Sequence, residues 1–250
     1  MADRDDRSPG TASRRRFLKD GALFSAAALV LPEVPAGLLS EQPEVSTASA
    51  VAFFDTLALT QVRRGTVRHT WVRKWGWPAT VRLHGAISET FRDDVAAAID
   101  DLTRLTGHEL VLEGDGVTRV GTIDIIVSPH DEIDGQFPSP GAVCNTHTRG
   151  ARGALYFARI DISEEYTDCL RHELMHAMGF ANHWMSPAAD TSMPSVLAMR
   201  NAPFRSEDYS EWDRLALRLL YHPDMQPGLP RGVALQKAEA MLIEALQDAT

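Results

Sequence analysis

His172, Glu173 and His176 form an H-E-x-x-H pattern within the run H-E-L-M-H. The pattern lies in a segment, about residues 165–178, that is expected to be helical, where positions four apart lie one turn apart on the same face. Two imidazoles placed in this way can bind one ion at about 2.0–2.1 Å, the usual zinc–nitrogen distance. The Glu173 carboxylate can accept a proton from a water molecule on that ion. The pattern therefore predicts a Zn²⁺ site with Glu173 as general base, and the alternative is two ordinary histidines on a helix.

The residues that follow resemble the signature of the metzincin zinc peptidases, H-E-x-x-H-x-x-G-x-x-H. Gly179 stands at the glycine, which in that family lets the chain turn and deliver a third ligand three residues later. This chain has Asn182 at the ligand's place and His183 directly after it. The arrangement is similar to that of snapalysin-like bacterial zinc peptidases, which carry Asp there, again followed by His.

The third metal ligand therefore has more than one candidate. A catalytic zinc site takes three protein ligands and keeps a fourth position for water. Histidine is a good zinc ligand and the asparagine amide is a poor one. We predict His183 as the third ligand, with Asn182, or a residue elsewhere such as Asp190, as the alternative. An ordinary polar loop position for His183 is the competing interpretation.

A weaker resemblance continues downstream of the histidines. Metzincins place a methionine turn under the metal, and residues 193–199 lie in the corresponding region, although Leu197 stands where a methionine is expected. Met199, or else Met193, is the candidate for that turn. Residues 209–221 resemble the closing helix of matrixin-type peptidases, and the run L-L-Y-x-P-x-M-x-P-G at 219–228 resembles a family of exported bacterial domains of unknown function.

Periodicity and turn residues predict a mixture of strands and helices. The expected strands are 68–75, 80–83, 109–112, 122–127 and 155–162, and the expected helices are 88–107, 165–178, 211–221 and 233–247. Residues 51–66 are expected to be a short lead-in and 128–153 a long loop. This order predicts an α+β domain. The resemblance implies a metzincin-like zincin domain with a mixed twisted sheet, an active-site helix and C-terminal helices.

The strand predicted at 155–162 directly precedes the metal-binding helix. In metzincin-like folds an edge strand near that helix pairs with an extended substrate, so the resemblance makes 155–162 the candidate for such a strand. The alternative is an ordinary strand inside the sheet.

Residues 13–19, S-R-R-R-F-L-K, match a twin-arginine export signal. The apolar run at 21–31 is too short to span a membrane and has the length of a signal-peptide core. We predict that residues 1–50 are a signal peptide and leader, and that the protein is periplasmic or extracellular and meets the membrane only during export. Residues 51–228 would form the metallopeptidase-like domain and 229–250 a C-terminal helix. The alternative for the N-terminus is an amphipathic helix with a basic end.

The chain has 2 cysteines, Cys144 and Cys169. In an oxidising compartment the simplest interpretation is one disulfide, which would close a loop of about 25 residues and contribute roughly 3 kcal/mol in the chain-entropy model. The bond would tie the predicted long loop to the start of the metal-binding helix. The alternative is two buried thiols.

The formal net charge is −9. Proteins that bind nucleic acids present basic surfaces, so we expect no nucleic-acid partner for this acidic chain.

The motif and the resemblance together predict an exported zinc peptidase that hydrolyses a peptide or protein substrate. Two alternatives are a non-catalytic exported binding domain on the same scaffold and a zinc amidase that acts on cell-wall material. The sequence leaves the substrate and the oligomeric state open.

Overall fold

A computed structural model describes residues 46–63, 66–114, 120–129, 143–163, 165–184, 193–198 and 205–248. All of these belong to the unit formed by residues 34–250. The predicted export signal lies outside the described residues. Among the helices that are described, none has the length and apolar character needed to cross a membrane.

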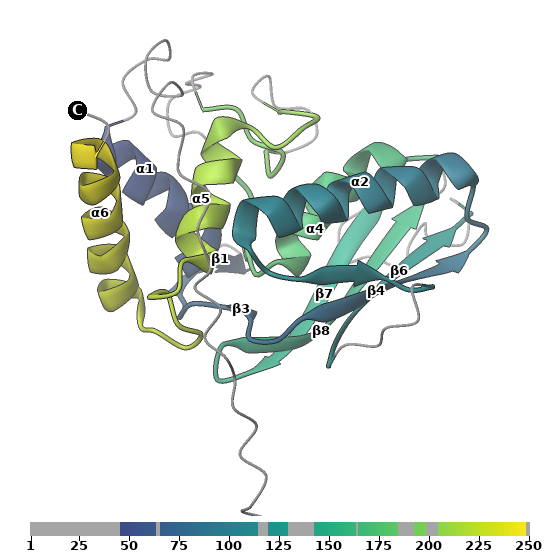
Figure 1. Cartoon of the computed structure of the whole chain (residues 1–250), viewed down its shortest axis with the longest axis horizontal. Helices are drawn as coiled ribbons and strands as arrows, with labels where there is room; N and C mark the ends of the chain where they lie inside the picture. Colours follow the sequence, from purple (N-terminus) through teal and green to yellow (C-terminus); the bar gives the residue numbers. More distant parts are fainter. Residues whose placement is uncertain are drawn as a thin grey trace, which may run out of the picture. The chain divides into compact units, whose positions relative to one another are not determined.

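A mixed sheet of six strands supports the rest of the described chain (Figure 1). Its strands are β3 (Lys74–Trp75), β4 (Ala79–Gly85), β5 (Leu110–Leu112), β6 (Gly121–Ser128), β7 (Cys144–Ala151) and β8 (Ala154–Ser163). The order β3-β8-β6-β4-β5 is parallel throughout, and β7 pairs antiparallel with β8. Strands β1 (Thr60–Arg63) and β2 (Thr66–His69) form a separate antiparallel pair. The prediction of a mixed sheet combined with helices is therefore confirmed.

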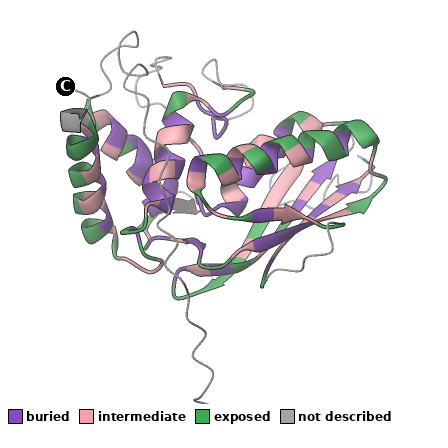
Figure 2. Ribbon diagram, in the orientation of Figure 1, coloured by how far each residue is buried: buried purple, intermediate pink, exposed green. Residues whose placement is uncertain are grey.

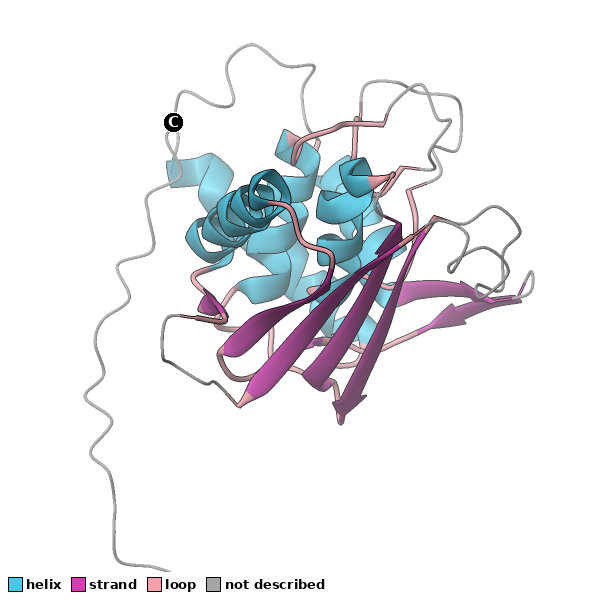
Figure 3. Ribbon diagram, turned by 90° about the vertical axis from the view of Figure 1, so that its right-hand side faces the viewer, coloured by secondary structure: helices cyan, strands magenta, loops and turns pink. Residues whose placement is uncertain are grey.

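The helices lie on one side of the sheet (Figure 3). They are α1 (Thr47–Phe54), α2 (Glu89–Thr106), α4 (Leu170–Ala177), α5 (Glu211–Tyr221) and α6 (Arg231–Asp248), together with the π-helical turn η2 (Asp55–Leu59) and the 3₁₀ turn η3 (Thr167–Cys169). In β6 the side chains of Ile123, Ile125 and Val127 are buried and the alternate ones are half-buried, as expected where helices pack on one face only (Figure 2). The core lies between this face and the helices.

Two of the predicted helices begin at capping serines. The Ser88 hydroxyl accepts a hydrogen bond from the Phe91 amide at the start of α2. Gly107, which ends that helix, has a left-handed φ of 65°. At α5, Ser210 and Asp213 form a reciprocal capping box. Local sequence signals therefore fix the ends of both helices.

The prediction of a long loop at 128–153 is wrong for residues 144–151, which form strand β7. Ile160 of β8 pairs with Ile125 of β6 on one side and with Thr146 of β7 on the other. Strand β8 is therefore internal, and the expectation that 155–162 is the edge strand is wrong. Strand β7 escaped prediction because it is polar: at the edge of the sheet it lacks the apolar alternation of a covered strand.

The short lead-in predicted at 51–66 is also wrong. Ser46 caps α1, and the side chains of Phe53 and Phe54 are buried. The Phe53 ring packs against Trp184 at 4.7 Å and against Trp212 at 5.5 Å between ring centroids. This segment is thus part of the core, and the boundary predicted after residue 50 falls inside α1. Helix α4 likewise starts later than predicted, at Leu170, after the turn η3.

Candidate metal centre

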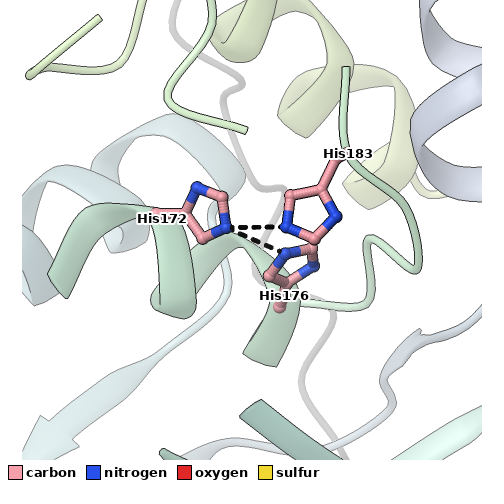
Figure 4. Close-up of side chains that lie close together, drawn as sticks. All are labelled: His172, His176 and His183. Atoms are coloured by element: carbon pink, nitrogen blue, oxygen red, sulfur yellow. Dashed lines mark hydrogen bonds between the residues drawn. The ribbon is translucent and has the colours of Figure 1, made fainter. Parts of the chain in front are cut away.

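Helix α4 and the turn after it bring three imidazoles to one point (Figure 4). Nε2 of His172 lies 3.2 Å from Nε2 of His176, one helical turn away, and 3.1 Å from Nε2 of His183. In a tetrahedral zinc site with zinc–nitrogen distances of about 2.0–2.1 Å, ligand nitrogens are roughly 3.3 Å apart. The spacing of these three residues, hereafter the histidine triad, therefore fits a single zinc ion.

The outer nitrogens of two triad members are fixed by backbone carbonyls. Nδ1 of His172 donates to the Val196 carbonyl at 2.7 Å, and Nδ1 of His176 donates to the Phe180 carbonyl at 2.8 Å. A carbonyl oxygen can only accept, so the proton of each neutral ring is on Nδ1 and its Nε2 carries a lone pair. Two lone pairs 3.2 Å apart repel each other unless a cation lies between them. The donor set is thus arranged for a metal.

Burial keeps the triad uncharged. Burial, and then the charges of His176 and His183, lower the pKa of His172 to about 2. Burial, and then His176, lower the pKa of His183 to about 4, and burial also lowers the pKa of His176. The imidazoles are neutral at pH 7, which is the form that binds a metal.

The turn that delivers His183 depends on Gly179. This residue has φ 118°, and a Cβ atom there would lie 2.0 Å from the Arg73 carbonyl oxygen. After it, the backbone amide of Ala181 donates to the Leu57 carbonyl in η2 at 2.9 Å. The Asn182 side-chain amide donates to the Thr56 carbonyl at 3.3 Å. Asn182 therefore anchors the turn to η2, and of the two adjacent candidates for third ligand only His183 lies in the triad.

Glu173 is buried beside the triad, with 5% of its surface exposed. Its Oε1 lies 3.9 Å from Nε2 of His172, and its Oε2 accepts a hydrogen bond from the Thr146 hydroxyl at 2.6 Å. Burial raises the pKa of Glu173 to about 7, while the bond from Thr146 opposes that rise. A carboxyl group with this pKa can both accept and release a proton near neutral pH.

Asp213 supports the carbonyl that holds His172. Its buried carboxylate accepts hydrogen bonds from the Ser195 hydroxyl at 2.6 Å, the Val196 amide at 3.0 Å and the Ser210 amide at 3.0 Å. One side chain thus caps α5 and fixes the loop whose Val196 carbonyl orients a triad member. The sequence signal of the capping box predicts the first role; nothing local predicts the second.

Two other predicted residues cannot be placed, because Met199 and Asp190 lie outside the described residues. Met193 is half-buried and packs against the core. In the loop that was expected to carry a methionine turn, Leu197 is fully buried.

Cys144 and Cys169 form a disulfide, as the first interpretation of the two cysteines predicts. Cys144 begins β7, and Cys169 immediately precedes α4. The bond therefore connects the edge strand to the helix that carries His172, Glu173 and His176.

Comparison with known proteins places the chain in one family. Residues 48–237 match the family described as protein of unknown function (DUF2927), which covers most of the chain and nearly all of the described residues. A comparison with curated proteins gave no match. The chain belongs to the DUF2927 family.

Proposed function

We propose that this member of the DUF2927 family is a zinc-dependent peptidase of the metzincin type. The observation that carries the proposal is the convergence of three Nε2 atoms, two of them with Nδ1 fixed by a carbonyl, beside the buried carboxylate of Glu173. Three protein nitrogens leave one position of a tetrahedral ion for water, which is the arrangement of catalytic rather than structural zinc sites.

Glu173 would move the proton in this reaction. Zinc bound by the triad would supply a Lewis acid that lowers the pKa of a bound water and polarises the scissile carbonyl. Glu173 Oε1, the carboxylate oxygen nearest His172 Nε2, would take the proton of the attacking water and return it to the leaving amine. The carbonyls of Val196 and Phe180 would hold the imidazoles in position throughout.

The arrangement of strands around α4 supports the metzincin type and a peptide substrate. Strands β3, β8, β6, β4 and β5 are all parallel. The antiparallel β7 pairs only with β8 among the described strands. The Thr146 hydroxyl links β7 directly to Glu173. An extended peptide that added to the outer side of β7 would therefore lie next to the proposed base.

Export is a further part of the proposal. It is supported by the twin-arginine pattern at residues 13–19 and by the Cys144–Cys169 disulfide, since disulfides persist in oxidising compartments outside the cytoplasm.

The test uses the full-length chain and two variants, Glu173→Gln and, as a control, Glu239→Gln on the exposed side of α6. Zinc per chain is measured by elemental analysis, and cleavage is measured on casein and on a cell-wall peptide amide. We expect one zinc in all three proteins and a loss of casein cleavage of about 10²- to 10⁴-fold in Glu173→Gln alone, the usual contribution of a general base.

Each outcome decides between the candidate functions. A chain without zinc that cleaves nothing would favour a non-catalytic binding domain. Cleavage of the cell-wall amide but not of casein would favour an amidase. Casein cleavage that survives in Glu173→Gln would overturn the assignment of Glu173.

A further inference from the structure

The two oxygens of the Glu173 carboxylate have different neighbours. Oε1 faces the histidine triad, at 3.9 Å from His172 Nε2. Oε2 faces the sheet and accepts a hydrogen bond of 2.6 Å from the Thr146 hydroxyl of β7. The same hydroxyl lies 3.1 Å from the backbone carbonyl of Glu173. One hydroxyl group thus contacts both the backbone and the side chain of the residue proposed as base.

The position of Thr146 is fixed by its strand and by the neighbouring disulfide. Thr146 pairs with Ile160, which is fully buried, so both side chains point to the face of the sheet that the helices cover. Cys144 and Thr148 lie on the same face of β7, since side chains alternate along a strand. Cys144 is joined to Cys169, directly before α4, and Thr148 accepts a hydrogen bond from Arg73 at 2.6 Å. Strand pairing and the disulfide therefore place the Thr146 hydroxyl, while Thr148 has a separate partner in Arg73.

We propose that Thr146 is a positioning residue for Glu173: by donating to Oε2 it turns Oε1 toward the histidine triad. The inference rests on the proposed function, in which Oε1 accepts the proton of the attacking water. A glutamate side chain has three rotatable bonds, and a hydrogen bond at its far oxygen selects one orientation among them. An error of about 1 Å in the placement of a reacting group can lower a rate by about 10²-fold.

The hydrogen bonds of the Thr146 hydroxyl both go to Glu173 and neither goes to a triad histidine, so its contribution can be separated from metal binding. Thr146→Val has almost the same shape and no hydroxyl, whereas Thr146→Ser keeps the hydroxyl. Thr148→Val is the matched control, because it removes a hydroxyl from the same face of β7 that contacts Arg73 instead of Glu173.

The first experiment compares zinc content and casein cleavage of the full-length chain with those of the three variants. We expect one zinc in every protein. We expect kcat to fall about 10- to 100-fold in Thr146→Val with KM nearly unchanged, to return most of the way in Thr146→Ser, and to change less than about 2-fold in Thr148→Val. Equal losses of kcat in Thr146→Val and Thr148→Val would overturn the inference, as would a failure of Thr146→Ser to restore the rate.

The second experiment needs no activity. The urea midpoint of the metal-free chain is measured for Thr146→Val in the natural background and in Glu173→Ala, where Oε2 is absent. We expect a clear downward shift in the first background and a much smaller one in the second. Equal shifts would show that the hydroxyl does not act through the carboxylate and would overturn the inference. A wild-type chain that binds no zinc and cleaves nothing would instead contradict the proposed function, and this result would be seen without any Thr146 variant.

Discussion

Two groups of buried ionisable side chains among the described residues can be compared, and they do different things. One is the histidine triad with Glu173. The other, hereafter the Lys74 cluster, consists of Lys74, His108 and Tyr221. Burial lowers the pKa of Lys74 to about 8, and burial followed by the charge of Lys74 lowers the pKa of His108 to about 4. By their pKa values alone, both groups could be taken for an active site.

The difference lies in where the polar atoms point. In the Lys74 cluster, Lys74 Nζ donates to the His222 carbonyl at the end of α5, and the Tyr221 hydroxyl donates to the Met178 carbonyl at the end of α4. These bonds satisfy carbonyls at two separate helix ends and join the helices to β3. In the triad, the bonds to carbonyls are made by Nδ1 atoms, and the Nε2 atoms converge. The candidate metal site is therefore distinguished by Nε2 lone pairs that converge on one point, more than by shifted pKa values.

The largest expected effect separates the two groups by zinc affinity. His183→Ala removes one of the three proposed ligands, and we expect zinc affinity to fall by more than 100-fold, beyond the roughly 10- to 100-fold loss that follows removal of a group that orients a ligand. His108→Ala, the control in the Lys74 cluster, should change it by less than about 2-fold. Competition with a chromophoric chelator measures both. Similar zinc affinities in the two variants would contradict the assignment of metal binding to the triad alone.

A smaller effect is expected when the support of each group is removed. Asp213→Ala leaves buried donors at Ser195, Val196 and Ser210 without their acceptor, at about 1–3 kcal/mol each, so we expect a loss of at least about 3 kcal/mol in unfolding free energy. Without Asp213 the Val196 loop would also orient His172 less firmly, and we expect zinc affinity to fall by about 10- to 100-fold. Tyr221→Phe should cost about 1–2 kcal/mol and leave zinc affinity unchanged. Urea titrations and chelator competition test both; an Asp213→Ala chain with normal affinity would separate the Val196 loop from the triad.

The smallest effect is a pH dependence of stability between pH 8 and 10, which the Lys74 cluster contributes. Lys74 has a pKa of about 8 in the folded chain, below its ordinary value of about 10.4, so between these pH values the unfolded chain binds more protons. Stability contributed at this position therefore increases as pH rises from 8 to 10. Urea midpoints of the metal-free wild type should rise relative to Lys74→Met over this range, with zinc affinity equal in the two proteins. A constant difference would show that Lys74 is not desolvated.

The residues that the sequence predicts well are those whose signals are local. The helices predicted at 88–107 and 211–221 form as α2 and α5, each capped by a serine, and the spacing of His172 and His176 places both on one face of α4. Asn182 and His183 are adjacent, and the sequence could compare them as third ligand only by how well each type of side chain binds zinc. Asn182 instead donates a hydrogen bond to Thr56, more than a hundred positions earlier, and this distant contact leaves His183 to join His172 and His176.

The supporting residues could not be predicted, because their partners are distant in sequence. Asp213 reaches Ser195 across 18 positions, and Thr146 reaches Glu173 across 27. Strand β7 has the composition of a loop and becomes a strand by pairing with β8. Helix α1 was missed for a similar reason, since its short apolar run becomes helical in the core against Trp184 and Trp212.

Gly179 has a consequence for the interpretation of related sequences. Its left-handed φ and its close approach to the Arg73 carbonyl are demands of the backbone, and neither involves the metal. A relative that had lost one of the triad histidines would still need a glycine here to close the same turn against the chain before β3. Conservation of this glycine across an alignment would therefore report that the fold is retained, and only the histidines and Glu173 would report whether the chemistry is retained with it.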